Sequence, residues 1–511
     1  PYKLENVRMS YLFPNMFPEH SSDKAKRFVF LLAVLLFINF YSISTLTTKP
    51  AYWYDEAINV ELARNFADFG KLDLVIAPNT FSGKGATVGS TGYPVTVPLA
   101  GFFKLFGFGL SQARIYMLLW MSALILVFFF IAKKLWSVYV AYAGTLLIAT
   151  FAPFYGNGRS VMGEIPGFLF SLLSFYFLEQ RKWWQSGILL GLAVISKPSI
   201  FIFLIPAYAL AVLLAGDVWK QKLLNLVKLG ASSLLALLPW FIIYAKEISR
   251  GGLGEDLLAH FKNPYSEAGA SVLQNISNNL PTLVTSTTLL YFLVLFAAVI
   301  LSLYLERTLF REYKNLFIFA SAYLPLALLQ YLKSFGYLRY LIAAELLIFI
   351  LFLIALPVLV RWLVSCCHSR GGGNPENDIR RKNWVPVFMG MTLAVIISVQ
   401  TVHLFWFSDL YPSEKTQKTF VYLFSEYPQA TFGVYNVPQL GSLLPSDKKY
   451  QYLSTYGLSH FGVNPFVVSG DRRPDVIVAD ADDPALSLFY EKDTAFSDGF
   501  LIYKHKQFPR P

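Results

Sequence analysis

Residues 28–56 read FVFLLAVLLFINFYSISTLTTKPAYWYDE, an apolar run long enough to cross a bilayer that leads into aromatic residues and two neighbouring carboxylates. Lys24, Lys26 and Arg27 precede the run, and no small-residue cleavage site follows it, so we expect it to remain as the first membrane span. Asp55 and Glu56 then lie in a loop close to the membrane surface. Stability gives no reason for an acidic pair there, which makes the pair the first candidate for chemistry.

The composition indicates an integral membrane protein. Of the 511 residues, 55% are hydrophobic and only 15% are charged, whereas soluble proteins have roughly a quarter of their residues charged. The net charge of +11 is spread between apolar segments, which argues against the clustered basic face of a nucleic-acid-binding protein. The sequence has no P-loop, no GxGxxG and no histidine pair at metal-binding spacing.

Hydropathy windows of about 19 residues predict a polytopic α-helical membrane protein with about eleven transmembrane helices. The stretch 187–215 is either one long helix kinked at Pro198 or two short spans, and two spans keep the orientation consistent. We place the spans near 28–48, 112–132, 138–154, 163–179, 184–197, 198–215, 228–246, 286–304, 316–333, 338–360 and 384–407.

The distribution of charge predicts the orientation. Loops on one side are rich in lysine and arginine, for example 133–134, 181–182 and 380–382, while charges in the loop 49–111 balance. The positive-inside rule therefore puts the N-terminus in the cytoplasm and the loops 49–111 and 247–285 outside. The layout favours a bacterial plasma membrane.

We divide the chain into a membrane module, residues 1–408, and a small extracytoplasmic α/β domain, residues 409–511. Strands are expected at 431–435 and 475–479, and a helix at 415–426. In the first outer loop, residues 55–69 have apolar side chains at helical spacing, which suggests an amphipathic helix on the membrane surface.

Asp55 and Glu56 suit acid–base chemistry. At the start of a helix, neighbouring side chains diverge by about 100°, so one carboxylate can face a reacting group while the other orients the helix. A carboxylate in a partly desolvated site can act as a base toward a hydroxyl. The alternative is a pair that only interacts with the helix dipole. The aromatic residues before it, including Tyr54, could equally form an interfacial belt.

Further charged residues are expected near the same surface. Glu164 and Arg159 lie in a short outer turn and are either functional or an ion pair that closes the turn. Lys84, Lys197 and Arg339 lie at or near outer edges, where cations suit an anionic phosphate or simply extend to lipid headgroups. Without a nucleotide-binding domain, an outer-face enzyme needs an activated donor in the membrane, and a polyprenyl phosphate carrying a sugar fits.

The order of short motifs along residues 28–345 resembles the GT-C membrane glycosyltransferases, in particular the protein mannosyltransferases and the lipid A aminoarabinose transferase. The motifs are Asp55-Glu-Ala57, Tyr93-Pro94, Lys104-Leu-Phe-Gly107, Ala113-Arg114, Arg159 with Gly163-Glu-Ile-Pro166, Gly191-Leu-Ala-Val-Ile-Ser-Lys197 and Leu338-Arg-Tyr340. Two departures from the family are Val95 after Tyr93-Pro94, where a second proline is usual, and the absence of prolines after Leu338-Arg-Tyr340.

The resemblance implies an inverting glycosyltransferase that moves a sugar from polyprenyl phosphate to an acceptor hydroxyl on the outer face. Asp55 would be the base, and Glu56 and Glu164 would complete the acidic site. The donor phosphate would be held by Lys84, Arg159, Lys197 and Arg339, and Tyr54 and Tyr93 would belong to the substrate loop. A divalent cation is a possible cofactor, although no metal ligand set is evident. The acceptor is a glycan, a lipid or a protein.

Two other function classes remain open. A transporter of lipids or oligosaccharides is predicted to have charges near the middle of the membrane, whereas here they gather at the outer edge. A polymerase or ligase of lipid-linked glycans shares the donor but usually relies on basic outer loops without an Asp-Glu pair.

Overall fold

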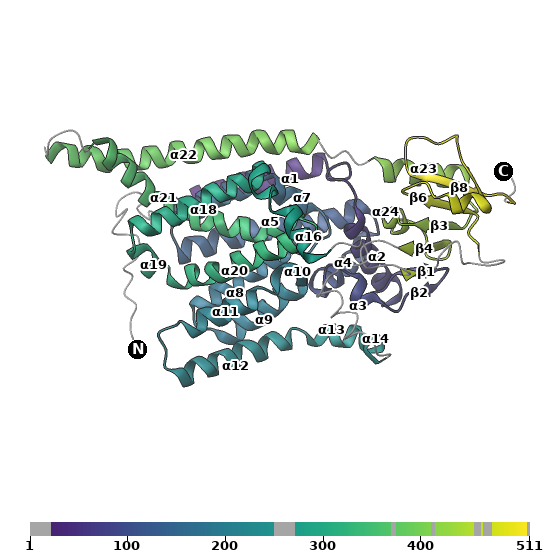
Figure 1. Ribbon diagram of the computed structural model, residues 1–511, viewed down its shortest axis with the longest axis horizontal. Coiled ribbons are helices and arrows are strands. Elements are labelled where there is room, and N and C mark those ends of the chain that lie inside the picture. The colour runs from purple at the N-terminus through teal and green to yellow at the C-terminus, as the bar shows by residue number, and fades with distance from the viewer. Residues whose placement is uncertain are drawn as a thin grey trace.

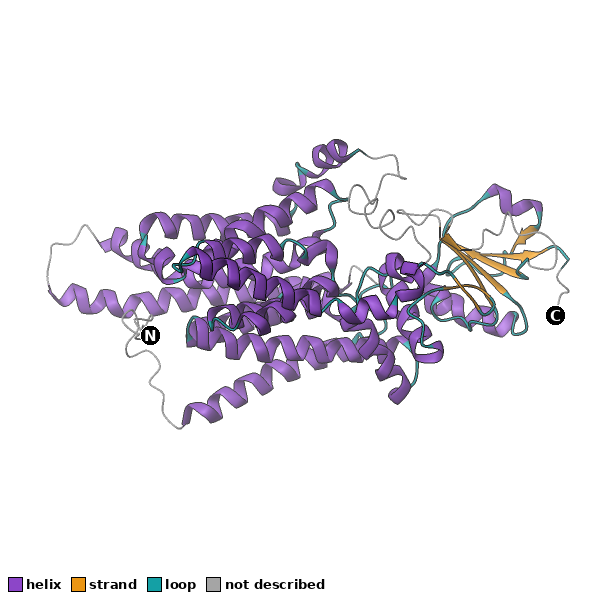
Figure 2. Cartoon of the chain, turned by 90° about the horizontal axis from the view of Figure 1, so that it is seen from below, coloured by secondary structure: helices purple, strands orange, loops and turns teal. Residues whose placement is uncertain are grey.

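The computed structural model describes residues 22–249, 271–368, 375–409, 414–453, 461–462 and 473–507. Long helices lie side by side in a bundle, and a β-sheet lies beyond one end of it (Figure 1). Seen from below, the six-stranded sheet is confined to that end (Figure 2). A short segment with α2, α3, α4 and the hairpin β1–β2 lies between the bundle and the sheet (Figure 1).

Seven helices of the described chain are long and apolar enough to cross a membrane, or up to eight if a pair bent by 69°, α6 and α7, counts as one span. The protein is therefore a polytopic helical membrane protein, as the sequence predicts. Every predicted span falls on helical segments, but several of these are divided into shorter helices that do not count alone, so the number eleven stays a prediction. The bundle helices are α1 (Ser22–Ser44), α5 (Leu110–Leu135), α6 (Val138–Thr150), α7 (Ala152–Arg159), α8 (Glu164–Glu179), α9 (Trp183–Ser196), α10 (Pro198–Phe201), α11 (Leu204–Leu213), α12 (Trp219–Leu235), α13 (Leu238–Ile243), α18 (Thr287–Leu305), α19 (Thr308–Glu312), α20 (Lys314–Lys333), η3 (Leu338–Leu341), α21 (Ile342–His368) and α22 (Pro375–Asp409).

The chain breaks at Lys197, between α9 and α10. Lys197 has φ −154° and ψ 86°, which is outside the helical region. Pro198 disfavours helical geometry at the residue before it and has no N–H to donate. The stretch 187–215 is thus two segments rather than one continuous helix, and the break leaves a buried lysine at the junction.

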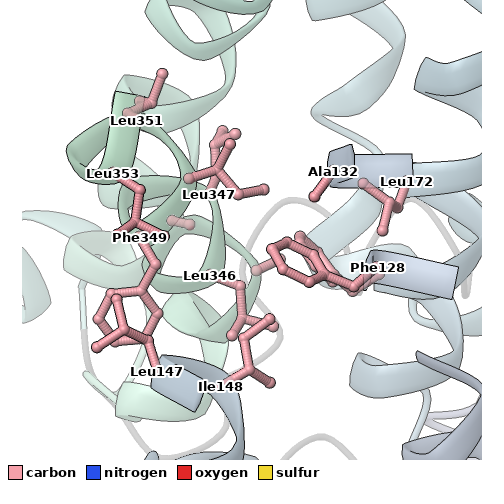
Figure 3. Close-up of a cluster of buried hydrophobic side chains, with 14 of the residues drawn as sticks. Phe128, Ala132, Leu147, Ile148, Leu172, Leu346, Leu347, Phe349, Leu351 and Leu353 are labelled. Carbon is pink, nitrogen blue, oxygen red and sulfur yellow. The ribbon is translucent and has the colours of Figure 1, made fainter. Parts of the chain in front are cut away.

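Helix α21 lies at the centre of the bundle, because 94% of its apolar window is buried. Leu346, Leu347 and Phe349 on this helix pack with Phe128 of α5 and Ile148 of α6 (Figure 3). Within a membrane, close packing of such side chains stabilises the bundle through van der Waals contacts rather than by removal from water. The resulting core fixes the helix that follows Arg339.

The first outer loop folds into its own small layer. It contains α2 (Tyr54–Phe69), β1 (Val75–Ala77), β2 (Thr80–Phe81), α3 (Gly85–Val88) and α4 (Tyr93–Phe106). Helix α2 confirms the helix predicted for 55–69, but ten of its sixteen residues are buried, among them Glu56, Asn59 and Glu61. It is therefore not an amphipathic surface helix: it is covered on several sides, and its polar residues have partners inside the protein.

The C-terminal region contains a six-stranded sheet in the order β5-β4-β3-β6-β8-β7. The three strands β4, β3 and β6 run parallel, and the outer pairs are antiparallel. The predicted strands and the predicted helix are confirmed as β3, β6 and α23. The elements are α23 (Lys415–Glu426), β3 (Phe432–Tyr435), α24 (Pro438–Gly441), β4 (Lys449–Leu453), β5 (Phe461–Gly462), β6 (Val476–Ala479), η5 (Pro484–Leu488), β7 (Tyr490–Lys492) and β8 (Leu501–His505).

The predicted second outer loop, 247–285, is described only in part, because residues 250–270 lie outside the described ranges. Its described helices are α14 (Ala245–Ser249), α16 (Val272–Asn279) and α17 (Thr282–Thr285). Asn279 at the end of α16 donates to the Ser334 carbonyl at 2.7 Å, and Asn275 donates to the Lys333 carbonyl at 3.1 Å. These bonds satisfy carbonyls at the end of α20 and fix the chain that leads to Arg339.

Candidate active site

Asp55 lies in the first turn of α2, with its side chain 26% exposed. Trp53, the residue before the helix, is extended, with φ −119° and ψ 174°, and the helix begins at the next residue. The Asp55 Oδ2 atom lies 2.8 Å from Nη2 of Arg339, and Arg339 lies in the 3₁₀ turn η3 that precedes the central helix α21. Residues almost 300 positions apart are thus joined at one point, and the carboxylate remains accessible.

Arg339 has more donors than Asp55 uses. Its side chain is only 10% exposed, and Nε and Nη1 are buried without a hydrogen-bond partner among the described residues. Its guanidinium stacks on Trp53, 4.2 Å from the ring centroid, and Tyr337 and Tyr340 lie 5.1 and 5.5 Å away. Because buried donors in native proteins are nearly always satisfied, two unpaired guanidinium donors indicate a place for an anionic ligand.

Glu56, the next residue of α2, has a different partner. Both of its oxygens accept from Arg114, at 2.9 Å from Nε and 2.8 Å from Nη2, and both side chains are fully buried. Arg114 also donates to the carbonyl of Leu46 at 2.8 Å. This two-pronged contact ties α2 to α5 and to the end of the first span. Glu56 thus anchors the helix that carries Asp55 and does not face an open site.

Glu164, the first residue of α8, lies close to Lys197. Its Oε1 is 3.9 Å from Nζ of Lys197, and their side chains are 0% and 2% exposed. That distance is too long for a hydrogen bond, and both Glu164 oxygens lack a partner among the described residues. Lys197 also interacts electrostatically with Asp55 and Arg339. Two carboxylates and two cations therefore share one region, with formal charges that sum to zero.

Two glycines allow this convergence. A Cβ on Gly163 would lie 1.8 Å from the Ser196 carbonyl oxygen, and a Cβ on Gly92 would lie 2.1 Å from that of Ile195. Any larger residue would push the chain before Glu164 away from the chain that ends at Lys197. Glycine at 163 is thus what lets the second carboxylate approach the buried lysine.

Four of the predicted site residues have contacts or positions other than the region around Asp55 and Arg339. Arg159 is buried and donates to the Thr45 hydroxyl at 2.6 Å. Lys84 is exposed at the start of α3, and none of the ion pairs among the described residues includes it. Tyr93 donates to the Ala236 carbonyl at 2.6 Å, and Tyr54 packs against the apolar cluster under α2. The roles predicted for all four stay predictions.

Sequence reasoning missed Asn59, one turn after Asp55 on the same face of α2. Its Nδ2 donates to the Val161 carbonyl at 2.8 Å and to the Thr91 hydroxyl at 2.9 Å. Asn59 therefore joins α2 to the segments that lead to Tyr93 and to Glu164. The signal available in the sequence was a polar residue four positions after Asp55, where helix periodicity repeats the same face. The stacking of Trp53 on Arg339 carried no such signal.

The described residues show no ligand set for a divalent cation in this region. Within the described residues, no three His, Cys, Asp or Glu side chains form a group that could hold a metal ion. Asp55 and Glu56 are each paired with an arginine. No chemical step below therefore depends on a metal.

Comparisons with known proteins agree with this arrangement. Residues 96–244 match the family model described as dolichyl-phosphate-mannose-protein mannosyltransferase. No curated protein matches the chain by sequence. The fold is similar to that of ArnT from Cupriavidus metallidurans bound to undecaprenyl phosphate, with TM-score 0.62 and 16% identity over 95% of this chain and 99% of that one. The apo form of the same protein matches with TM-score 0.61 and 14% identity, over 94% and 98%.

A more distant solved structure is the oligosaccharyltransferase of Archaeoglobus fulgidus in complex with Zn and sulfate. It matches with TM-score 0.53 and 12% identity, over 94% of this chain and 74% of that one. At such identities the likeness shows the fold. The family match over residues 96–244 and the shared fold agree with the resemblance to the GT-C glycosyltransferases.

Proposed function

We propose that the chain is an inverting glycosyltransferase that transfers a sugar from a polyprenyl phosphate to an acceptor hydroxyl, with Asp55 as the general base. The contact between Asp55 and Arg339 carries the proposal, because two buried donors of Arg339 have no partner in the described part of the chain and lie beside an accessible carboxylate. The structure of ArnT with bound undecaprenyl phosphate supports a donor of this class.

The reaction is a single displacement. The acceptor hydroxyl gives its proton to Asp55 as its oxygen bonds to the anomeric carbon on the face opposite the phosphate. The bond from that carbon to the phosphate oxygen breaks, and the phosphate leaves with the electron pair. General base catalysis of this kind contributes typically 10²–10⁴-fold.

The cations would stabilise the leaving phosphate. Arg339 has two donors, Nε and Nη1, without a hydrogen-bond partner among the described residues, on either side of the Nη2 that Asp55 uses. Charge-assisted hydrogen bonds from such donors suit a phosphate, and Lys197 supplies a second positive charge within interaction range. The four charged side chains have a net formal charge of zero, so binding a phosphodiester would give the region a net charge of only −1. Glu164, whose buried oxygens have no hydrogen-bond partner among the described residues, would accept hydrogen bonds from sugar hydroxyls.

The proposal includes the location of the reaction. The positive-inside distribution of charge supports an active site and a C-terminal domain on the extracytoplasmic face of a bacterial plasma membrane. The acceptor is then a glycan, a lipid or a protein exposed at that face, since the sequence and the described site select none of the three.

A donor panel tests the proposal. Purified protein in lipid nanodiscs is incubated with polyprenyl-phosphate-linked hexoses, mannose among them, and with membrane extract as the source of acceptors. Released polyprenyl phosphate is measured by mass spectrometry. Asp55→Asn should lower the turnover rate by at least 10² while undecaprenyl phosphate still binds. Asp68→Asn, an exposed carboxylate on the same helix, is the matched control. Unchanged turnover in Asp55→Asn would refute Asp55 as the general base, and no release of polyprenyl phosphate by the wild type with any donor would favour a transporter.

A further inference from the structure

The C-terminal domain contacts the helix that carries Asp55 at several points. The Tyr52 hydroxyl lies 2.6 Å from the Ser442 hydroxyl, just before α2 begins. Arg64, on the helix itself, donates to the Ser442 carbonyl at 3.1 Å and to the Leu444 carbonyl at 2.8 Å. Leu453 of β4 packs in the same apolar cluster as Ile58 and Leu62. The domain thus contacts α2 and the residues just before it, and α24 lies beside α2 in Figure 1.

Glu61 and Lys449 form the centre of this contact. Lys449 Nζ lies 2.6 Å from Glu61 Oε1, and the side chains are 2% and 1% exposed. The same lysine donates to the Gly441 carbonyl at 2.9 Å, and the same carboxylate oxygen accepts from the Val75 backbone at 3.1 Å. One ion pair therefore joins four elements: α2, β1, β4 and α24.

A buried ion pair contributes little net free energy to holding two surfaces together. Both charges lose their hydration, and apolar residues of similar size often stabilise as well or better. What a buried pair supplies instead is a fixed geometry, since each partner has only one low-energy place. Burial lowers the pKa of Lys449, and the Glu61 carboxylate opposes that shift. The pair therefore favours one register of α2 against the sheet.

That register decides where Asp55 lies. Glu61 follows Asp55 by six residues, about 9 Å along a helix, and Tyr52 precedes Asp55 by three. The catalytic turn thus lies between two contacts with the C-terminal domain. A displacement of about 1 Å in a reacting group can cost on the order of 10² in rate.

We propose that the C-terminal domain is a positioning element of the active site: Lys449, through Glu61, holds α2 in the register that presents Asp55 to the acceptor hydroxyl. The inference rests on the proposed function. Lys449 is a positioning residue, because it touches neither substrate nor the reacting atoms.

The experiment compares Lys449→Met with Lys492→Met in the full chain in nanodiscs. Lys492 lies in the same domain, in an exposed pair with Asp482, and controls for the loss of a lysine. Three quantities are measured: turnover of the hexose donor that the wild type uses, binding of undecaprenyl phosphate, and hydrogen–deuterium exchange in peptides that contain Asp55. All are measured well below the unfolding temperature.

Lys449→Met should lower kcat at least tenfold and leave the Kd for undecaprenyl phosphate within twofold, because Arg339 and Lys197 come from other elements. Exchange at the start of α2 should rise, and Lys449→Arg should restore most of kcat. Lys492→Met should match the wild type. If Lys449→Met does not fold, Ser442→Ala, which removes the partner of Tyr52, takes its place with the same expected direction.

Two results would overturn the inference. The first is a kcat of Lys449→Met within twofold of the wild-type value. The second is a Lys449→Met protein that is less stable overall but shows unchanged hydrogen–deuterium exchange at the start of α2. Failure of the proposed function looks different, because Asp55→Asn would then keep its turnover. If Asp55→Asn is inactive while Lys449→Met is active, only the positioning role is wrong.

Discussion

Arg114→Met should destabilise the protein strongly, because Arg114 holds the buried carboxylate of Glu56. In the wild type, Glu56 accepts two hydrogen bonds from Arg114, at 2.9 and 2.8 Å, and both side chains are 0% exposed. The variant leaves Glu56 as an unpaired buried charge and the Leu46 carbonyl without its donor. Hydrogen bonds to charged groups are worth about 1.5–3 kcal/mol each, and breaking a buried pair costs about 3–5 kcal/mol. We therefore expect a loss of about 3–5 kcal/mol.

The double variant Glu56→Leu with Arg114→Met separates the cost of an orphaned charge from the value of the pair. Apolar residues of similar volume remove both buried charges, so most of the lost stability should return. Arg114→Lys keeps the charge but loses the planar fork, and its stability should lie between those of Arg114→Met and the wild type. The matched control is Asp217→Asn, which breaks a pair with Arg181, whose side chain is 66% exposed. It should cost no more than about 1 kcal/mol.

The assay is equilibrium unfolding in mixed micelles, followed by circular dichroism as the fraction of sodium dodecyl sulfate rises. If Arg114→Met lost less than about 1 kcal/mol, the bidentate pair would not anchor α2 as described. A double variant as unstable as Arg114→Met would show that the loss comes from packing rather than from the orphaned carboxylate of Glu56.

Three further predictions concern the charged region. Arg339→Lys should raise the Kd for undecaprenyl phosphate about tenfold, because a lysine cannot supply two donors in one plane; calorimetry in nanodiscs measures this, and an unchanged Kd would contradict the phosphate role. Glu164→Gln should lower kcat by about 10-fold or more, because a hydrogen bond to a charged group is worth about 1.5–3 kcal/mol; release of polyprenyl phosphate measures this, and full activity would leave Glu164 a structural residue. Gly163→Ala should destabilise by about 1–3 kcal/mol, because the added Cβ would lie 1.8 Å from the Ser196 carbonyl oxygen; Gly156→Ala, whose Cβ would meet no neighbour within 4 Å, is its control in the same unfolding assay.

The sequence by itself determined the class of protein and its main segments. Long apolar runs require helices in a membrane, because no other open structure satisfies its backbone hydrogen bonds there. The sequence predicted two strands and a helix in the C-terminal region, at 431–435, 475–479 and 415–426, because the patterns that indicate them are local. The break at Lys197 followed from Pro198. The choice of Asp55 and Glu56 as candidates also needed only their place after the first span.

The tertiary structure alone decided which charges meet. Asp55 with Arg339, and Glu61 with Lys449, are separated by hundreds of residues, and no periodicity predicts a contact across such distances. The sequence also could not predict that Asp55 and Glu56 have different partners, because the side on which each carboxylate lies depends on how α2 packs. Burial of α2 was missed for the same reason: the sheet that covers it comes from the other end of the chain. Local sequence patterns fix helices and strands, whereas the site is made by packing between distant segments.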